Sequence, residues 1–160
     1  MIIVTGGAGF IGSNLVAALA ARQAGDIVVC DRMESDDRWR NLADSEIHDI
    51  IPPDRLLSFV QSHARDISAI LHLGAISATT ETNVDRLIEN NIRLSIDLWD
   101  LCSRDEIRYF YASSAATYGD GRSGFVDWET PEELATLRPL NAYGWSKHLV
   151  DRRFAREVER

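Results

Sequence analysis

Short apolar runs alternate with longer amphipathic segments along most of the chain. The runs predict strands at residues 2–4, 27–30, 69–75 and 108–112, with a shorter strand at 47–51. The β-branched run at residues 2–4 has no polar alternation, which is typical of a parallel strand buried on both faces. Apolar residues recur at helical spacing over residues 10–23, 53–60 and 84–103. Strands that alternate with helices predict an α/β fold, a Rossmann-like doubly wound parallel sheet with helices on both faces.

The remaining segments are less regular. A polar loop is predicted at residues 32–38, after the second strand. Residues 39–49 are predicted to be partly helical. Residues 119–139 are irregular apart from one predicted turn of helix at 131–135, whereas residues 141–160 read as a final helix. The sequence has no internal repeat and no low-complexity linker. One domain over residues 1–160 is therefore the prediction.

The first strand ends in a glycine-rich turn that reopens as a helix. Gly6, Gly9 and Gly12 give G-x-x-G-x-x-G, and Gly7, Gly9 and Gly12 also satisfy G-x-G-x-x-G. In either register one glycine permits a tight turn, one lets the backbone approach a pyrophosphate, and Gly12 lets the helix pack closely on the strand. The helix N-terminus then offers N–H groups and a positive dipole end to the phosphates.

Glycine-rich loops also serve as ordinary turns, so the surroundings of this loop decide its interpretation. The second strand ends in Asp31, about 20 residues past the glycines, where a dinucleotide fold places the carboxylate that binds a ribose. Strand, turn, helix and acid in this order favour a dinucleotide site over a purely structural turn, so we predict one NAD(P)-binding, Rossmann-like domain over residues 1–160.

Composition narrows the classes of partner. The 160 residues are 45% hydrophobic and 26% charged, with a net charge of -8, so the balance favours neither nucleic acid nor an anionic membrane. No apolar run approaches the roughly 18 residues that span a bilayer, and no secretory signal is visible, so we expect a cytoplasmic protein. Cys30 and Cys102 fall in strand and helix patterns as small apolar residues, and the four histidines show no ligand spacing. We therefore expect no metal site.

Candidate proton-transfer chemistry lies near the end of the chain. Tyr143 and Lys147 are four residues apart on the last predicted helix, hence about one turn apart on one face. An ammonium beside a phenol favours the phenolate and brings a pKa near 10 toward neutrality, so that the tyrosine can exchange protons with a sugar hydroxyl. The same spacing also occurs on ordinary amphipathic helices. Ser114 strengthens the catalytic interpretation, because its hydroxyl follows a central strand, where open α/β sheets bind ligands.

Taken together, T-G-G-A-G-F-I-G-S, S-S-A-A-T-Y-G and Y-x-x-x-K resemble the extended short-chain dehydrogenase/reductase family. Within it, G-A-I-S-A-T-T-E (residues 74–81), E-N-N (89–91), Y-A-S-S-A-A-T-Y-G (111–119) and P-L-N-A-Y-G-W-S-K (139–147) are similar to the nucleotide-sugar epimerases that act on ADP-heptose. The similarity runs the whole length of the chain.

The resemblance implies a role for each matching residue. Tyr143 would be the catalytic acid/base, Lys147 would hold the nicotinamide ribose and lower the tyrosine pKa, and Ser114 would hydrogen-bond the reacting sugar oxygen. The implied cofactor-binding residues are Gly6, Gly9, Phe10, Ile11, Gly12, Asp31, Arg32, Arg38, Leu73, Gly74, Ala75, Ile76, Ser77, Asn90 and Lys147. Two of them have simpler alternatives, since Asn90 could only support helix packing and Leu73 could belong to the core.

The residues around the adenosine ribose give a mixed cofactor prediction. Asp31 favours the 2′-hydroxyl of NAD, whereas Arg32 and Arg38 could pair with a 2′-phosphate, and the heptose epimerases use NADP. Pro53 stands where those enzymes usually have a lysine. The resemblance favours NADP, with NAD as the alternative.

The resemblance also bears on substrate and length. It implies a nucleotide-sugar substrate, ADP-heptose, and a homo-oligomer in the full-length form. Those enzymes continue past the Tyr/Lys helix into a C-terminal substrate domain, so we expect this chain to be truncated before it. A dehydratase is less favoured, because Ala115 and Ala116 stand where acidic residues are expected. A non-catalytic dinucleotide-binding fragment is the third hypothesis.

Overall fold

Five short parallel strands form one sheet. The computed structural model describes residues 1–158, and its strands are β1 (Ile2–Thr5), β2 (Ile27–Cys30), β3 (Asp49–Ile51), β4 (Ala69–His72) and β5 (Arg108–Tyr111). Their order is β3-β2-β1-β4-β5, and Val4 of β1 pairs with Val29 on one side and Leu71 on the other. The central strands are buried, as expected of a parallel sheet with both faces covered. The predicted fold class is confirmed.

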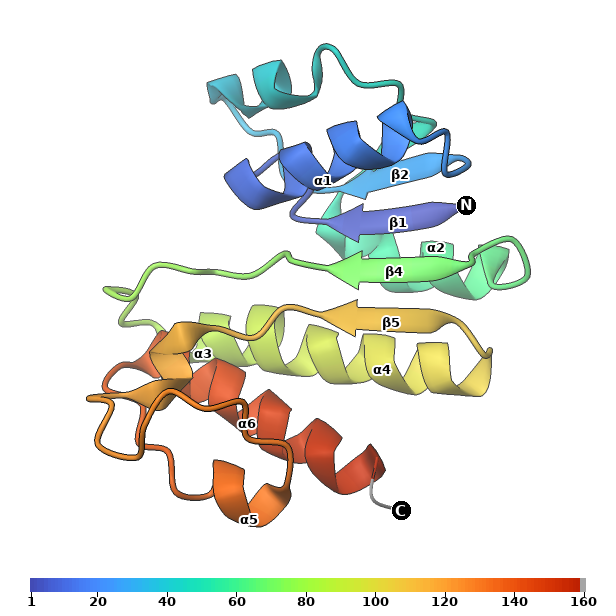
Figure 1. Cartoon of the computed structure of the whole chain (residues 1–160). Coiled ribbons are helices and arrows are strands. Elements are labelled where there is room, and N and C mark those ends of the chain that lie inside the picture. Colours follow the sequence, from blue (N-terminus) through green and yellow to red (C-terminus); the bar gives the residue numbers. More distant parts are fainter. Residues whose placement is uncertain (159–160) are drawn as a thin grey trace. The chain divides into compact units, whose positions relative to one another are not determined.

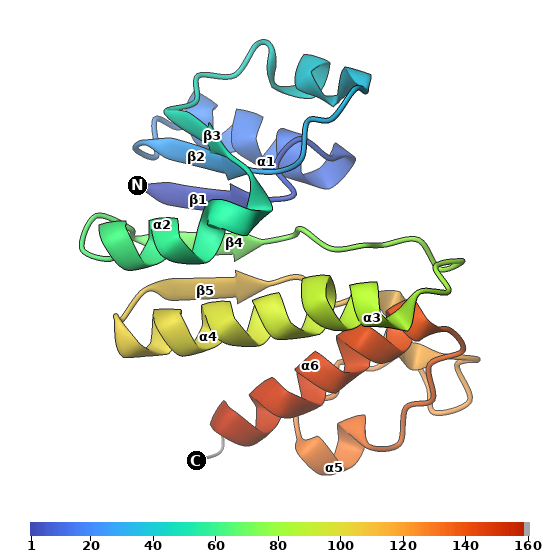
Figure 2. The same ribbon diagram turned by 180° about the vertical axis from the view of Figure 1, so that it is seen from behind.

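The crossover helices divide between the two faces of this sheet. The segments α1 (Phe10–Ala21) and the 3₁₀ turn η1 (Asp37–Leu42) connect β1 to β2 and β2 to β3. The turn η2 (Pro53–Arg55) and α2 (Leu56–His63) lead to β4, and α4 (Leu94–Arg104) leads to β5. Figure 1 shows α1 in front of the sheet. Figure 2 views the chain from behind, and there α2 lies in front of the sheet. Right-handed crossovers require this arrangement, because the strand order reverses its direction at β1.

The chain divides into two compact units, each built from two separate segments. Unit 1 comprises Met1–Gly74 and Asp97–Ala112, and unit 2 comprises Ala75–Ile96 and Ser113–Arg160. Unit 1 therefore contains the sheet and the glycine-rich turn. The predicted single NAD(P)-binding domain over residues 1–160 stays a prediction.

Unit 2 is mainly helical and is organised on one long helix. That helix is α6 (Ala142–Val158), and it packs against α3 (Val84–Leu87), the π-helical turn η3 (Ile88–Arg93), the 3₁₀ turn η4 (Ala115–Tyr118) and α5 (Pro131–Leu134). The short α5 begins with a capping box, in which Thr130 and Glu133 satisfy each other's backbone N–H groups. This device explains how one helical turn persists in an otherwise irregular segment.

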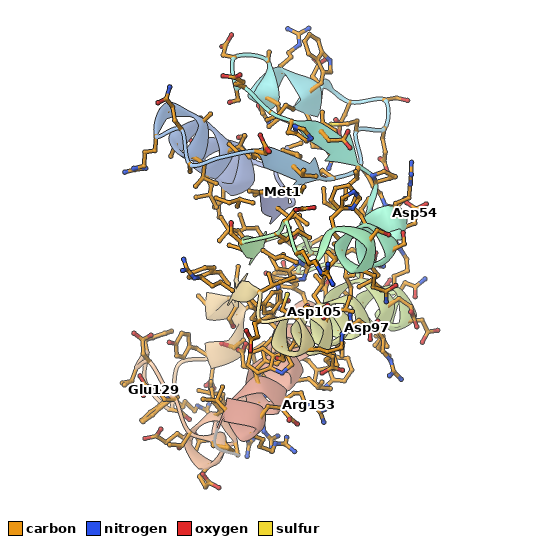
Figure 3. The ribbon with its side chains drawn as sticks, turned by 90° about the vertical axis from the view of Figure 1, so that its right-hand side faces the viewer. Met1, Asp54, Asp97, Asp105, Glu129 and Arg153 are labelled. Carbon is orange, nitrogen blue, oxygen red and sulfur yellow. The ribbon has the colours of Figure 1, made fainter. Side chains whose placement is uncertain are left out.

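The core of unit 1 lies between β1, β2 and α1. Val4, Val16, Ile27 and Val29 are almost fully buried there, and Leu73 packs against this cluster. Cys30 and Cys102 are buried free thiols, as the sequence predicts, and burial raises the pKa of each to about 12. Charged side chains such as Asp54, Asp97, Glu129 and Arg153 lie at the surface (Figure 3).

Several element boundaries differ from the sequence prediction, and the strand predicted at residues 69–75 ends at His72. The strand predicted at residues 47–51 is only Asp49–Ile51, where ladder pairing to β2 occurs. The helix predicted over residues 84–103 is interrupted by η3, since Ile88–Arg93 is wound as a π-helix. The final helix begins at Ala142 and is described to Val158, and the last two residues of the prediction lie outside the described residues.

Within residues 1–158, no helix is both long and apolar enough to cross a membrane.

Candidate functional site

The glycine-rich turn of unit 1 depends on close backbone contacts. Gly6 has a φ of +66°, and a Cβ added there would lie 2.8 Å from the backbone of Gly74. A Cβ on Gly12 would overlap the carbonyl oxygen of Gly6, so only glycine lets α1 start this close to β1. A Cβ on Gly9 would meet only the Gly6 oxygen, at 3.2 Å. Gly9 is thus the position of the three at which the backbone leaves room for an approaching group.

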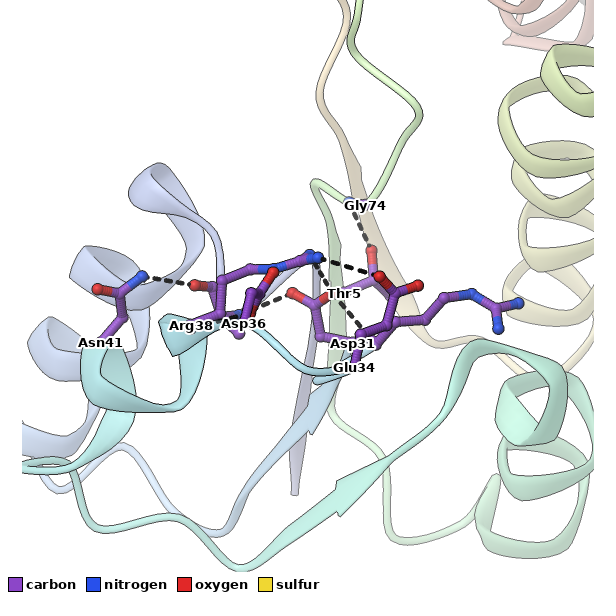
Figure 4. A network of polar contacts seen from close by, with 9 residues as sticks. Thr5, Asp31, Glu34, Asp36, Arg38, Asn41 and Gly74 are labelled. Carbon is purple, nitrogen blue, oxygen red and sulfur yellow. Dashed lines mark hydrogen bonds and ion pairs between the residues drawn. The ribbon is translucent and has the colours of Figure 1, made fainter. Parts of the chain in front are cut away.

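The contact between Gly6 and Gly74 lies at the switch point of the sheet. The chain leads from β1 to β2 on one side of this strand pair and from β4 to β5 on the other, and open α/β sheets bind ligands beyond the carboxyl ends of such strands. Thr5 fixes this junction, because its Oγ1 accepts the Gly74 N–H at 2.9 Å and lies 2.7 Å from His72 Nδ1. Figure 4 shows Thr5 and Gly74 joined in this way. Thr5 therefore holds the two loops together.

Asp31 braces the glycine-rich turn from the end of β2. Its Oδ2 accepts the Ala8 N–H at 2.9 Å, and its Oδ1 accepts the Arg32 N–H at 2.8 Å. Asn41 of η1 donates to the Ala8 carbonyl at 2.8 Å, so both backbone groups of this buried residue are held by side chains. The predicted ribose carboxylate thus lies next to the predicted pyrophosphate turn.

Arg38 lies among carboxylates at the same edge (Figure 4). Its guanidinium donates to Asp36 and lies 3.7 Å from Asp31 and 4.0 Å from Glu34. Hydrogen bonds from the Arg38 backbone and side chain lower the pKa of Asp36. The structure therefore places Arg38 beside Asp31, and the carboxylates of Asp36 and Glu34 also pair with its guanidinium.

The other predicted cofactor residues of unit 1 differ in exposure. Phe10 is 86% exposed and Ile11 68% exposed at the start of α1, which is unusual for large apolar side chains. Arg32 is also exposed, whereas Leu73 is half-buried against the core. Phe10 and Ile11 are thus available to a ligand, and Leu73 has a packing role that accounts for its apolar character.

In unit 2, Asn91 joins three elements. Its side chain donates to Ile76 O at 3.0 Å and to Ser146 Oγ at 3.0 Å, and its Oδ1 accepts the Ile76 N–H at 2.9 Å. Asn91 is completely buried. Asn90, which the sequence interpretation selected, is half-buried and donates to Arg86 O, one turn back along its own helix. Asn91 is therefore the asparagine that holds the backbone of Ile76, in the middle of the loop formed by Ala75, Ile76 and Ser77.

Ser114 begins the turn that follows β5, which we call the Ser114 turn (residues 113–118). Its Oγ accepts the Ala116 N–H at 3.2 Å and caps η4. Helix α6 comes close to this turn, because a Cβ on Gly144 would lie 2.5 Å from the Ala116 carbonyl oxygen. Gly144 directly follows Tyr143, so the structure brings the Ser114 turn against the segment of α6 that carries the candidate acid/base.

Tyr143 and Lys147 lie one turn apart on α6, as predicted. Asn141 starts this helix by accepting the Gly144 N–H at 2.8 Å. Tyr143 is half-buried and Lys147 is only 2% exposed. Burial lowers the pKa of Lys147 to about 8, although the charge of Asp151 acts in the opposite direction. Lys147 therefore lies on the buried face of α6 and not on its solvated face, while the catalytic interpretation of the Tyr/Lys spacing stays a prediction.

Sequence reasoning missed four residues that structure this region. They are Asn91, Ser113, Gly144 and Asp151. Asn91 and Ser113 each stand beside a residue that was selected, and Gly144 and Asp151 lie on the Tyr/Lys helix. A glycine inside a helical pattern is a signal of close backbone approach that could have identified Gly144. In the part of the chain that the structure describes, no cluster of three or more potential metal ligands occurs.

Known proteins resemble this chain in sequence and fold. An ADP-L-glycero-D-manno-heptose-6-epimerase of Fusobacterium nucleatum is 46% identical over 153 residues, which cover 94% of this chain and 46% of that protein. The crystal structure of the Helicobacter pylori ADP-L-glycero-D-manno-heptose-6-epimerase matches 98% of this chain and 50% of its own, with a TM-score of 0.80 and 26% identity. The UDP-glucuronic acid 4-epimerase of Bacillus cereus in complex with NAD matches 98% of this chain and 51% of its own, with a TM-score of 0.77 and 28% identity.

These matches cover nearly all of this chain but only about half of each known protein. The chain spans about half the length of the curated relatives it matches. The model of the NAD dependent epimerase/dehydratase family matches residues 2–156, which is nearly all of it. With its parallel sheet, its glycine-rich turn and a buried lysine one helical turn from a tyrosine, this chain belongs to the NAD dependent epimerase/dehydratase family.

Proposed function

We propose that this chain provides the dinucleotide-binding and proton-transfer parts of an ADP-L-glycero-D-manno-heptose 6-epimerase. Such an enzyme interconverts ADP-D-glycero- and ADP-L-glycero-D-manno-heptose. The observation that carries the proposal is the pair Tyr143 and Lys147 on one face of α6, with the Ser114 turn packed against the same helix. The 46% identity to a heptose epimerase supports the choice of sugar nucleotide.

The residues of unit 1 fit a nicotinamide dinucleotide. The N-terminus of α1 has no side-chain cap, and Gly9 leaves its backbone open to a pyrophosphate. Asp31 is held beside this turn, where its carboxylate can accept ribose hydroxyls. When bound, the cofactor would supply hydride-transfer chemistry at a sugar carbon, with no net redox change over the whole reaction.

Tyr143 is proposed to move the proton of the reacting sugar hydroxyl. A phenol must approach its phenolate form to accept this proton near neutral pH, and a neighbouring ammonium stabilises that form. The pKa of Lys147 is about 8, so the ammonium is its main form at pH 7. Lys147 is thus charged where the proposed chemistry requires it and can also donate to a ribose hydroxyl.

Ser114 is proposed to orient the sugar. Its Oγ accepts from the Ala116 N–H, an arrangement that fixes the oxygen while the hydroxyl proton can donate to the reacting sugar oxygen. The approach of α6 at Gly144 supports a common site for Ser114 and Tyr143. Orientation of this kind lowers the barrier because the reacting groups no longer have to find each other.

For the cofactor we propose NADP, with Arg32 and Arg38 receiving the 2′-phosphate. Arg32 is exposed and free to turn toward a phosphate, whereas Arg38 would exchange its contacts with Asp36 for the new anion. NAD is the second candidate, and a specific observation favours it. The cluster of Asp31, Glu34 and Asp36 would remain intact around a 2′-hydroxyl but repel a 2′-phosphate.

The alternatives use the same scaffold. Another NAD(P)-dependent nucleotide-sugar epimerase or dehydratase would keep Tyr143 and Lys147 but bind a different sugar. A non-catalytic dinucleotide-binding fragment would bind the cofactor alone. A cytoplasmic location and a homo-oligomer of the full-length protein remain part of the proposal.

A chimera separates these possibilities. The 153 aligned residues of the Fusobacterium nucleatum epimerase are replaced by those of this chain, and the interconversion of the two ADP-heptose epimers is followed by NMR. We expect the chimera to epimerise ADP-heptose, and the 160-residue chain alone to bind dinucleotide without epimerising. A folded chimera that binds dinucleotide but leaves both epimers unchanged contradicts the proposed activity.

A further inference from the structure

Ser113 and Asp151 connect the two elements that carry the proposed proton-transfer groups. Ser113 Oγ donates to Asp151 Oδ2 at 2.6 Å, a short distance typical of a hydroxyl bound to a carboxylate. Ser113 directly precedes Ser114, and Asp151 lies on α6 one turn beyond Lys147. One hydrogen bond therefore fixes the start of the Ser114 turn to the helix that carries Tyr143 and Lys147.

Tyr143, Lys147 and Asp151 follow one another at intervals of four residues along α6. Residues with this spacing lie near one another on a helix surface. Burial disfavours the ammonium of Lys147, and the carboxylate of Asp151 is the charge that favours it. Reciprocally, burial raises the pKa of Asp151, while the Ser113 hydroxyl, Lys147 and His148 lower it.

Other charged groups near α6 are less well placed to act on Lys147. The charged side chains of α3 and η3 are exposed, namely Asp85, Arg86, Glu89 and Arg93. On α5, Glu132 is exposed and Glu133 binds Thr130 within its own capping box. Solvent screens exposed charges, so Asp151 is the group whose charge Lys147 senses most strongly.

We propose that Asp151 is a positioning residue of this site, which anchors the Ser114 turn to α6 through Ser113 and keeps Lys147 in its ammonium form. The inference rests on the proposed function, because it assigns Asp151 a role in the same proton transfer. A buried lysine without a nearby carboxylate would lose its proton closer to neutral pH. It would then stop stabilising the Tyr143 phenolate within the pH range of the cell.

The chain allows a direct measurement, because Lys147 is its only lysine. Biosynthetic labelling with ¹³Cε-lysine gives a single NMR resonance, and its chemical shift follows the protonation of that amine. In the wild-type chain we expect a titration midpoint near the pKa of about 8. The same resonance should show a second, smaller inflection at acid pH, where Asp151 titrates above the ordinary aspartate pKa.

Asp151→Asn removes the charge but keeps an oxygen that can accept from Ser113. We expect its Lys147 midpoint to move to lower pH. Glu157→Gln is the matched control, since it removes the same charge from α6 at a residue that pairs with Arg153, and its midpoint should equal that of the wild type. An unchanged midpoint in a folded Asp151→Asn chain overturns the proposal.

Ser113→Ala tests the hydrogen bond separately. Because the Ser113 hydroxyl stabilises the charged carboxylate, its loss should move the acid inflection of the Lys147 resonance to higher pH. Absence of that inflection in the wild type overturns the coupling even if the Asp151→Asn chain fails to fold. No dinucleotide or sugar is needed for these titrations, so their outcome is independent of the dinucleotide and epimerisation assays that test the proposed function.

Discussion

The side-chain amide of Asn91 donates to the Oγ of Ser146, 55 residues further along the chain, at 3.0 Å. The same amide holds both backbone groups of Ile76, and Ser146 in turn donates to the carbonyl oxygen of Tyr143 at 2.7 Å. A buried polar group connects the β4 exit loop, the π-helical turn and the first turn of α6. Such a network stabilises a structure only when every member is satisfied.

Asn91→Ala should therefore destabilise the chain strongly. It leaves the Ile76 N–H and C=O without their partner, and buried unsatisfied groups cost about 1–3 kcal/mol each. Asn90→Ala is the matched control, because the half-buried Asn90 makes one bond within its own helix and should cost less than about 1 kcal/mol. Urea unfolding followed by circular dichroism measures both, and equal losses would contradict the assignment to Asn91.

The contact between Asn91 and Ser146 also illustrates which features the sequence predicts and which it does not. The strands, the glycine-rich turn and the Tyr/Lys spacing were predictable because each depends on residues close together in sequence. The π-helical turn has no compositional signal, and adding one residue to a turn rotates the following side chains around the axis. Asn91 of this turn donates to Ser146, whereas Asn90 donates to Arg86 within its own helix, and the cofactor role predicted for Asn90 stays a prediction.

Contacts between distant segments were also beyond the sequence. Ser113 and Asp151 are 38 residues apart, and neither belongs to a local pattern that would indicate the other. The carboxylates around Arg38 could not be predicted either. An arginine in a polar loop is a candidate phosphate ligand as long as its neighbours in space are unknown. Residue types suggested the chemistry, but tertiary structure decides which groups are already paired.

The three glycines of the turn should respond differently to substitution. Gly12→Ala places a Cβ against the Gly6 backbone, which cannot move aside, and should cost about 1–3 kcal/mol of stability or more. Gly9→Val has no such overlap and should cost only about 1 kcal/mol, typical of a poor helix N-cap. Isothermal titration should nevertheless show that Gly9→Val loses dinucleotide binding. Retained binding in this variant would contradict the role of Gly9 in pyrophosphate approach.

Arg32 should distinguish NADP from NAD. If Arg32 contacts the 2′-phosphate, Arg32→Ala should weaken NADP binding by about 1.5–3 kcal/mol, typical of a charged hydrogen bond, and leave NAD unchanged. Arg40→Ala serves as the control, because Arg40 is an exposed arginine nearby that pairs with Asp37. Calorimetric titration of both cofactors measures the difference. Equal affinity changes for both would make Arg32 a solvated loop charge and favour the Asp31 interpretation of NAD.

Burial of Lys147 should appear in the pH dependence of stability. Its pKa is about 8 in the folded chain against the ordinary 10.5, so between these values the unfolded chain binds more protons. Stability relative to Lys147→Met should therefore rise as the pH increases from about 8 to 10.5. The rise should reach roughly 3 kcal/mol, because a tenfold change in protonation equilibrium corresponds to about 1.4 kcal/mol. A flat difference would mean that Lys147 is solvated.

Tyr143→Phe tests the proposed chemistry most directly in the chimera that carries the remainder of a heptose epimerase. The variant removes only the phenolic oxygen, so cofactor affinity should be retained while turnover of ADP-heptose falls about 10²–10⁴-fold, as expected when a positioned acid/base is lost. Lys147→Ala should lower both turnover and cofactor affinity, because that residue is proposed to hold the ribose as well as to tune the phenol. Tyr109→Phe is the control, since Tyr109 lies within β5 with its ring edge against Trp99, and should leave turnover within a few-fold of the parent. If Tyr143→Phe turns over at the parent rate, the Tyr/Lys pair has a structural role only, and the proton must be carried by another group.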